Sequence, residues 1–268
     1  MTEIAAFARP ESLEATATHY CPGCSHGVIH RLIAELLDEL GLRRRTVTIL
    51  PVGCSVLGYN YFATDCQEAS HGRAPAVATG VKRARPDLFV LSYQGDGDLA
   101  SIGAGEIVHC ANRGEKITVV FVNNATYGMT GGQMAPTTLP NQETTTSVGG
   151  RDVDRTGYPI RVAELLSTLR TPAFIARGAA HTPRHAIHAK ALLRRAFRCQ
   201  MEGRGFSLVE MLAICPTNWA MPPAEASRWL EQQMIPYYPL GVFKTPDGPD
   251  RAPLPLATLP EAGREGAR

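Results

Sequence analysis

The sequence lacks an apolar run of the roughly eighteen residues that a membrane-spanning helix needs. Its first twenty residues lack the basic start and apolar block of a secretory signal. Neither sign of charge dominates, because 27 lysines and arginines stand against 25 acidic residues. These absences argue against a membrane span and against a surface for nucleic acid or membranes, and they predict a cytoplasmic protein.

Cysteine is present but does not form the pattern of a disulfide-stabilised protein. The chain has seven cysteines, an odd number, and a reducing compartment disfavours a disulfide framework. Each cysteine is therefore either a ligand of a metal or cofactor or a small buried side chain of the core. Cys66, Cys110 and Cys199 have no partner pattern, so no role is assigned to them.

The 268 residues, 44% of them hydrophobic, suffice for one large α/β domain or two small ones. No internal repeat is present. Periodicity predicts alternating helices and strands; the helices are expected at 28–40, 74–84, 98–113, 161–169, 183–202 and 223–233, and the strands at 46–53, 88–94, 116–122, 173–177 and 206–214. This alternation predicts an α/β fold with a mostly parallel, doubly wound sheet and helices on both faces. We expect one domain over residues 1–244, followed by a Pro/Gly-rich tail over 245–268.

A loop rich in glycine and threonine follows the third predicted strand, at residues 123–150. Loops of this length in a compact domain are usually functional.

The sequence GDGD at 95–98 has two interpretations. Gly95-x-Gly97-x-x-Ala100 follows a strand and opens a helix, and Glu115 lies about twenty residues on, as in a nicotinamide-dinucleotide fingerprint. However, the Asp96 carboxylate would repel a diphosphate unless a cation lay between them.

A magnesium ion removes this conflict, because Mg²⁺ commonly bridges one or two protein oxygens to phosphate oxygens. The next strand ends in Asn123-Asn124, and Asn124 lies 28 residues after Asp96. A βαβ unit takes about thirty residues, so both side chains are expected in the crevice at the carboxyl ends of adjacent strands. The glycines would let backbone N–H groups approach the diphosphate, and the helix that begins at Asp98 would add its positive end.

Four cysteines have positions that suit a shared site. Cys21 and Cys24 form a CxxC pair before a helix, and Cys54 and Cys215 each follow a strand. Four thiolates suit zinc or a [4Fe–4S] cluster, and the number of ligands does not separate the two. A redox dithiol at Cys21 and Cys24 is a third interpretation, although no thioredoxin-like βαβ pattern surrounds it.

The spacing of GDG and NN resembles the thiamine-diphosphate-binding motif, and the chain as a whole resembles the β subunits of 2-oxoacid:ferredoxin oxidoreductases. The resemblance spans roughly residues 18–243. It includes the segments CPGCSHG (21–27), GCS (53–55), SHGRAPAVATG (70–80), GDGD, NNATYGMTGGQMAPTT (123–138), CPTNW (215–219) and MIPYYPLGVFK (234–244).

The resemblance assigns roles by position. It implies Mg²⁺ ligands at Asp96, the Asn124 side chain and the Thr126 backbone carbonyl. The positions that it implies for contacts to thiamine diphosphate are Val52, Gly53, Cys54, Ser55, His71, Gly95, Gly97, Asp98, Gly128 and Met129. It also implies a [4Fe–4S] cluster on Cys21, Cys24, Cys54 and Cys215. His26 directly follows the CxxC segment and is a candidate hydrogen-bond donor to the groups that hold the site.

The resemblance implies oxidative decarboxylation of a 2-oxoacid with coenzyme A to acyl-CoA and CO₂, with electrons passing through the cluster to ferredoxin. It implies an obligate α subunit, which supplies the activating glutamate, and further γ and ferredoxin-like δ subunits. No catalytic base is therefore assigned to this chain. Gly131, where some 2-oxoglutarate-type relatives carry lysine, favours a branched-chain substrate such as 2-oxoisovalerate over 2-oxoglutarate. The remaining alternatives are a non-oxidative thiamine-dependent decarboxylase, a nicotinamide dehydrogenase and a structural zinc-binding subunit.

Overall fold

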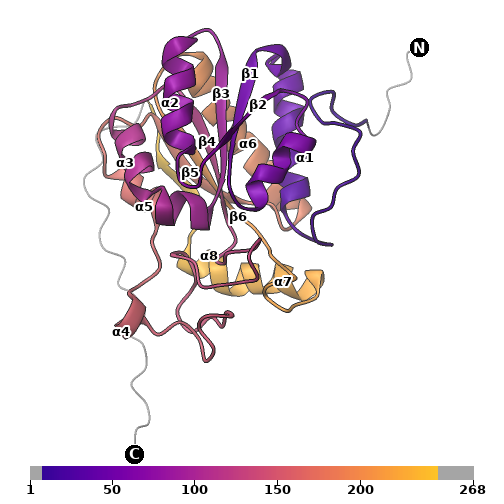
Figure 1. Ribbon diagram of the computed structural model, residues 1–268, viewed down its shortest axis with the longest axis vertical. Helices are drawn as coiled ribbons and strands as arrows, with labels where there is room; N and C mark the ends of the chain where they lie inside the picture. The colour runs from indigo at the N-terminus through magenta and orange to yellow at the C-terminus, as the bar shows by residue number, and fades with distance from the viewer. Residues whose placement is uncertain (1–7, 247–268) are drawn as a thin grey trace, which may run out of the picture.

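The computed structural model describes residues 8–246 and confirms the predicted α/β architecture (Figure 1). In this described part of the chain, seven strands form one sheet: β1 (Thr46–Pro51), β2 (Asp65–Ala69), β3 (Phe89–Gly95), β4 (Thr118–Asn123), β5 (Phe174–Ala179), β6 (Ser207–Leu212) and β7 (Gly241–Lys244). Their order across the sheet is β2-β1-β3-β4-β6-β5-β7, and only β7 runs antiparallel to its neighbour.

The helices cover both faces of this sheet. The α-helices are α1 (His26–Glu39), α2 (Ala74–Ala84), α3 (Ala104–Asn112), α4 (Val153–Thr156), α5 (Val162–Ser167), α6 (Pro183–Met201), α7 (Pro223–Trp229) and α8 (Ile235–Tyr237). Shorter turns of other helix types are η1 (Arg43–Arg45), η2 (Cys54–Asn60), η3 (Asp98–Ile102) and η4 (Leu230–Met234). In Figure 1, α2, α3 and α5 lie on one face, and α1 and α6 lie on the other.

Two apolar cores follow from this layering. The regularly spaced apolar side chains of α1 pack with α6 against one face, and the small side chains of α2 and those of α3 pack against the other. Sequence signals set the bounds of α6 as predicted, because Thr182 Oγ1 accepts the His185 N–H at its start and Gly203 follows it with φ +65°. None of the helices in residues 8–246 is both long and apolar enough to cross a membrane.

Several segments differ from the sequence-based expectations. Strands β2 and β7 were not predicted, since β2 is a polar edge strand and β7 is only four residues long. No element was predicted before residue 28, yet this part of the chain is anchored at Ser12, which is fully buried and donates its hydroxyl to Asp38. From residue 247 on, the expected tail lies outside the described residues.

A third layer closes the carboxyl edge of the sheet. The 124–152 loop region and the α7–η4–α8 segment lie below the strand ends in Figure 1. Their apolar side chains form a separate core that includes Leu139, Trp219, Leu230, Met234 and Tyr238. This layer brings the long loop against the strand ends that carry the predicted site.

Candidate cofactor and metal site

The predicted site residues follow four neighbouring strands. Cys54 comes shortly after β1, Asp96 directly after β3, Asn124 directly after β4 and Cys215 shortly after β6. These strands are adjacent and parallel, in the order β1-β3-β4-β6. The two cysteines and the two oxygen-bearing side chains therefore share the carboxyl edge, where open α/β sheets bind ligands.

Three oxygen-bearing groups converge at the centre of this edge. One terminal atom of the Asn124 amide lies 2.7 Å from the Thr126 carbonyl oxygen and 3.3 Å from Asp96 Oδ1. If that atom is nitrogen, it donates to both oxygens; if it is oxygen, three oxygens meet and need a cation among them. Neighbouring ligands of an octahedral Mg²⁺ lie about 3 Å apart, so the spacing fits such an ion.

Asp96 is held firmly in this position. Its Oδ2 accepts the Thr137 hydroxyl at 2.6 Å, and its Oδ1 accepts the Gly97 N–H at 2.8 Å. The side chain is buried, and burial raises the pKa of Asp96 to about 6 although these hydrogen bonds favour the charged form. A bound cation would compensate this buried carboxylate.

The glycines around the edge differ in what their missing side chains allow. A Cβ at Gly53 or Gly95 would meet nothing within 4 Å, so the backbone there is open to a ligand. A Cβ at Gly97 would lie 2.2 Å from Cε1 of Tyr127, whose hydroxyl donates to the Gly97 carbonyl. Gly53 and Gly95 thus leave room for a diphosphate. At Gly97 the ring of Tyr127 already fills the space that a side chain would need.

The Asp98 carboxylate is turned into the protein. Its Oδ1 accepts the Gly72 N–H at 2.5 Å and meets His71 Nδ1 at 2.6 Å, and its Oδ2 accepts from Gln94 at 2.7 Å. Any diphosphate contact at Asp98 is therefore left to its backbone. The same contacts fix the His71 ring, whose Nε2 makes no hydrogen bond within residues 8–246.

The four cysteines gather beside the oxygen cluster. A Cβ built on Gly128 would lie 3.4 Å from Cys54 Sγ, 3.6 Å from Cys215 Sγ and 3.6 Å from the Asn124 amide. Gly128 therefore lies between two thiols and the candidate Mg²⁺ ligand. The CxxC pair forms a turn in which the Cys24 N–H donates to the Cys21 carbonyl at 3.0 Å.

The thiols interact with one another electrostatically. Burial, with smaller contributions from the nearby Cys215, Cys54 and Cys21, raises the pKa of Cys24 to about 12. Burial likewise raises the pKa of Cys54 to about 11, with contributions from Cys215, Cys21 and Asp96. The raised pKa values of Cys24 and Cys54 keep these two thiols protonated until a metal binds, because a coordinating thiol loses its proton.

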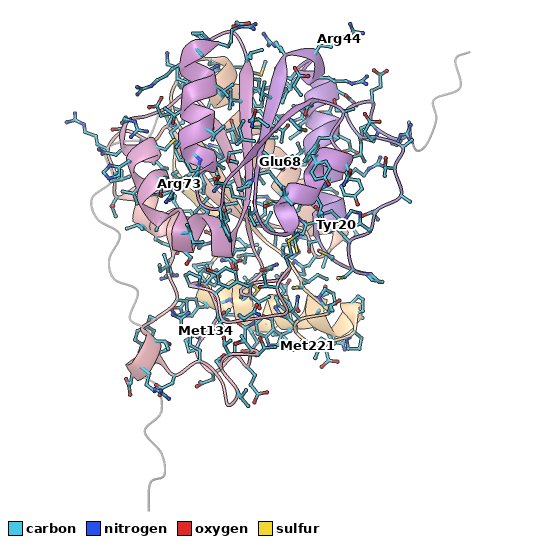
Figure 2. The ribbon with its side chains drawn as sticks, in the orientation of Figure 1. Tyr20, Arg44, Glu68, Arg73, Met134 and Met221 are labelled. Atoms are coloured by element: carbon cyan, nitrogen blue, oxygen red, sulfur yellow. The ribbon has the colours of Figure 1, made fainter. Side chains whose placement is uncertain are left out.

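The remaining predicted contacts lie around the same edge. Val52 and Met129 are both more than 40% exposed, so their side chains face outward from the chain. Ser55 is buried and its hydroxyl donates back to the Pro51 carbonyl at 3.3 Å, so a cofactor contact there would come from the backbone. Figure 2 shows Tyr20 near the strand ends and Met134 and Met221 on the segments below.

Comparisons with known proteins show the family to which the chain belongs. Residues 51–211 match the family model of the thiamine pyrophosphate enzyme, C-terminal TPP binding domain. A 2-oxoglutarate synthase subunit KorB of Archaeoglobus fulgidus is 35% identical over 86% of this chain and 80% of its own length. The chain is a member of the thiamine-pyrophosphate-dependent 2-oxoacid oxidoreductase family.

Other members of the oxidoreductase family are similar in sequence or in fold. The ketoisovalerate oxidoreductase subunit VorA of Methanothermobacter thermautotrophicus is 49% identical over 89% of this chain. The chain spans about half the length of that relative. The solved 2-oxoglutarate:ferredoxin oxidoreductase from Magnetococcus marinus, which has 2-oxoglutarate, coenzyme A and succinyl-CoA bound, superposes with a TM-score of 0.72 at 27% identity, over 92% of this chain and 88% of that one.

The nicotinamide interpretation of GDGD is wrong. Besides the family match, Glu115 lies before β4, at the opposite end of the strands from the GDGD loop. There it pairs with Arg83 at 2.6 Å and Arg113 at 2.8 Å. Its distance along the sequence from the glycines is therefore a coincidence.

Three residues on the loops support the site, although no sequence pattern marks them. Thr137 donates to Asp96, and the Asn218 amide donates to the Gly128 carbonyl at 2.8 Å and to Cys215 Sγ at 3.3 Å. Trp219 Nε1 donates to the Asn124 carbonyl at 3.0 Å. Asn218 and Trp219 lie in the CPTNW motif and Thr137 in the threonine-rich loop, but nothing in their spacing shows what they contact.

Proposed function

We propose that this chain is the cofactor-binding subunit of a 2-oxoacid:ferredoxin oxidoreductase that binds thiamine diphosphate, Mg²⁺ and a [4Fe–4S] cluster. The observation that carries the proposal is the convergence of Cys54, Asp96, Asn124 and Cys215 at the ends of four adjacent strands. The reaction would convert a 2-oxoacid and coenzyme A into acyl-CoA and CO₂ and send two electrons to ferredoxin. A cytoplasmic location, where thiols stay reduced, would suit such a cluster.

The candidate Mg²⁺ ligands match a magnesium-bound diphosphate. Asp96, Asn124 and Thr126 offer three oxygens at suitable spacing, and the open backbone at Gly53 and Gly95 leaves room for phosphate oxygens. Thiamine diphosphate supplies a thiazolium carbanion that attacks the 2-oxo carbon and stores the electrons left by decarboxylation. The protein would hold the diphosphate through Mg²⁺ and orient the ring by the contacts around His71 and Gly128.

The four cysteines support a cluster better than a tetrahedral zinc ion. Sulfurs around zinc lie about 3.8 Å apart, given Zn–S bonds of roughly 2.3 Å. Among residues 8–246, no three of these sulfurs lie within 4.8 Å of one another. A cubane cluster needs wider spacing, because each thiolate binds a different iron. The cysteines also adjoin the candidate thiamine site, where electrons from decarboxylation need an exit.

A partner subunit is part of the proposal. No base for activating the cofactor is assigned to this chain, and Val52 and Met129 expose apolar surface beside the site. An α subunit would cover this edge and supply the activating glutamate, with γ and ferredoxin-like δ subunits as further members. The names of the relatives, each called a subunit, are consistent with such an assembly.

A branched-chain 2-oxoacid is the proposed substrate. Identity to the ketoisovalerate oxidoreductase subunit is 49%, against 35% for the 2-oxoglutarate synthase subunit. Gly131 also leaves this loop position without a cation for a second carboxylate. 2-Oxoglutarate is the alternative substrate, and turnover of both acids by the co-expressed complex separates them.

The central test is anaerobic purification of the chain with its partner. We expect about four irons and one thiamine diphosphate per copy, and bleaching of the cluster by 2-oxoacid plus coenzyme A. Cys215→Ser should lower bound iron and ferredoxin reduction at least tenfold. Cys66→Ser is the matched control, because Cys66 lies exposed on β2, and it should change neither quantity.

Different results would support the alternatives. A colourless complex that holds zinc on these cysteines would overturn the cluster and favour a structural zinc subunit. Release of aldehyde and CO₂ without ferredoxin reduction would favour a non-oxidative decarboxylase. Asp96→Asn should remove thiamine diphosphate while leaving the iron content near wild type, which tests the two cofactor sites separately.

A further inference from the structure

A second group of ligand-type side chains lies outside the proposed cofactor site. His181 lies in the loop between β5 and α6, His185 lies in the first turn of α6, and Glu231 lies on η4. They offer two imidazole nitrogens and a carboxylate oxygen, all within 4.8 Å of one another. Within residues 8–246, this is the only such group of three or more histidine, cysteine or acidic side chains.

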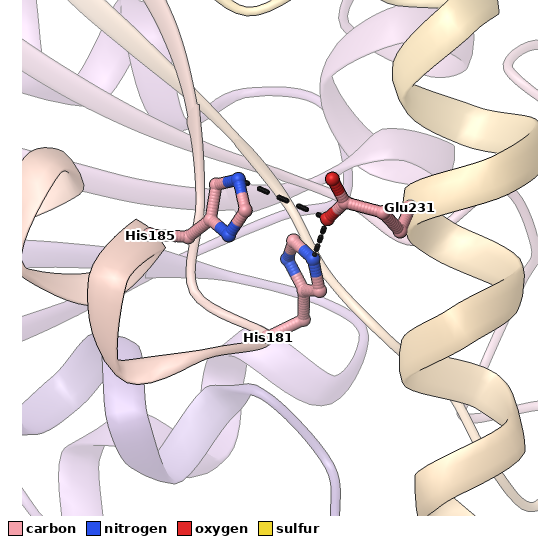
Figure 3. A group of neighbouring side chains, drawn as sticks. All are labelled: His181, His185 and Glu231. Atoms are coloured by element: carbon pink, nitrogen blue, oxygen red, sulfur yellow. Dashed lines mark hydrogen bonds and ion pairs between the residues drawn. The ribbon is translucent and has the colours of Figure 1, made fainter.

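The ligand atoms converge on one point. Figure 3 shows both rings directed at the Glu231 carboxylate from separate segments. His181 Nε2 lies 2.6 Å and His185 Nε2 3.8 Å from Glu231 Oε2, and the two rings are stacked with centroids 4.3 Å apart. Ligands about 2.1 Å from a tetrahedral zinc ion lie roughly 3.4 Å apart, so small side-chain movements would accommodate the ion.

The surroundings prepare these side chains for a metal. His185 Nδ1 meets Thr182 Oγ1 at 2.7 Å, so the protein orients the ring through one nitrogen and leaves Nε2 toward Glu231. The His181 side chain is fully buried, and its Nδ1 has no hydrogen-bond partner among residues 8–246. Its other nitrogen, Nε2, faces Glu231 Oε2, so both imidazoles present one nitrogen to the same carboxylate oxygen.

We propose that His181, His185 and Glu231 form a site for a divalent transition metal, with Zn²⁺ as the ion of choice. Two imidazoles and one carboxylate suit Zn²⁺ better than Mg²⁺ or Ca²⁺, which prefer oxygen ligands. The side chain of Glu231 is 51% exposed, so the ion can enter from solvent and water can complete its coordination.

The ion would join two parts of the fold. Glu231 belongs to the α7–η4–α8 segment, which covers the carboxyl edge, whereas His181 and His185 belong to the β5–α6 connection. The protein already joins them weakly here, since Ser227 Oγ donates to the His181 carbonyl at 3.3 Å. A zinc bridge would stabilise the covering segment against the sheet, so its role is structural.

The test measures zinc binding by the purified complex, with the cluster intact and Mg²⁺ in excess. After equilibrium dialysis against micromolar zinc, wild type should hold about one more zinc per copy of this chain than His185→Gln or Glu231→Gln. Zinc should raise the melting temperature of wild type by several degrees and leave that of both variants unchanged. His188→Gln is the matched control, because His188 is exposed one turn further along α6, and it should behave as wild type.

Equal zinc in wild type and His185→Gln would overturn the proposal. An ion pair without metal would show as a lower melting temperature for Glu231→Gln, with or without zinc, and no zinc shift in wild type. Both variants leave the buried ring of His181 in place, so loss of folding is not the expected reason for a negative result. Iron and thiamine diphosphate content are measured in the same samples, so failure of the proposed function is detected separately.

Discussion

At the scale of single residues, alanine substitutions at two glycines near the cofactor site are expected to have different effects: one on cofactor binding and the other on stability. A Cβ at Gly128 makes only ordinary contacts of 3.4–3.6 Å with Cys54, Cys215 and Asn124, and the backbone there has no positive φ. Gly128→Ala should therefore fold with a change below about 1 kcal/mol in the free energy of unfolding. Its methyl group would occupy the space between thiols and amide, so bound iron and thiamine diphosphate should fall several-fold.

Gly97→Ala provides the contrast. Its methyl group would overlap the ring of Tyr127, so the substitution should lower the melting temperature of the cofactor-free protein. Melting curves of the two apo-proteins, followed by iron and thiamine analysis, distinguish the cases. A marked loss of stability in Gly128→Ala would mean that the space around Gly128 serves packing, not a ligand.

His26 makes the stability of the fold depend on pH. Its ring is buried, stacks on Tyr20 at 4.7 Å and meets the Tyr93 hydroxyl at 2.5 Å. Burial lowers the pKa of His26 to about 4, whereas an unfolded histidine has a pKa of about 6.5. Between these values the unfolded chain binds the extra proton, so stability is lost as pH falls from about 6.5 to 4.

Urea unfolding of wild type and His26→Gln at several pH values measures this loss. Wild type should be the more stable at pH 7.5, and its advantage should shrink by about 3 kcal/mol on going to pH 4. His188→Gln, a substitution of an exposed histidine on α6, is the surface control measured alongside. An advantage of wild type over His26→Gln that stays constant with pH would mean that the His26 ring is not buried as described.

At the scale of elements, the α7–η4–α8 segment supports the ligands of the site from below. The buried Tyr238 hydroxyl donates to the Thr137 carbonyl at 2.7 Å, and Thr137 donates to Asp96. Tyr238→Phe should cost about 1–2 kcal/mol of unfolding free energy, because it leaves a buried carbonyl without this donor. It should also weaken thiamine diphosphate binding a few-fold, since Thr137 would then be free to move.

Tyr237→Phe is the neighbouring control. The Tyr237 hydroxyl donates to Pro159 at 3.4 Å, a longer bond that lies away from Asp96. Calorimetric titration of thiamine diphosphate in the presence of Mg²⁺ should show near wild-type affinity for Tyr237→Phe and weaker binding for Tyr238→Phe. Equal weakening in both would mean that the segment acts as a whole and not through the Tyr238–Thr137 bond.

Elements also differ in how well the sequence predicts them. Strands β1, β3, β4 and β6 are buried and rich in apolar residues, and the ends of these segments are enough to place Cys54, Asp96, Asn124 and Cys215 at one edge of the sheet. Strand β2 carries exposed polar residues, so no hydrophobic pattern marks it. Asn218 and Thr137 act through loop conformation, which has no period, and the inward turn of the Asp98 carboxylate depends on a histidine and a glycine far away in sequence.

At the scale of the whole molecule, a chain of polar and charged side chains links the strand end at Asn123 through β6 and β5 to α5. Asn123 donates to Glu210 Oε1 at 2.8 Å, and Glu210 Oε2 pairs with Arg177 at 2.9 Å. Arg177 also pairs with Glu164 of α5 at 2.5 Å. The two asparagines of the NN motif thus have different tasks, since Asn123 anchors the strand end and Asn124 faces the oxygen cluster.

Arg177→Met tests this charge chain. Burial disfavours the charged form of Arg177, but the carboxylates of Glu210 and Glu164 outweigh it and raise the pKa of the guanidinium above its usual value. Removing the arginine leaves Glu210 buried without its partner, which should cost about 3–5 kcal/mol in urea unfolding. Adding Glu210→Gln removes the stranded charge and keeps an acceptor for Asn123, so the double variant should regain at least about 1 kcal/mol. If the unfolding free-energy costs of Arg177→Met and Glu210→Gln simply add in the double variant, the two side chains stabilise the fold independently. Their ion pair would then not help to hold the strand end at Asn123.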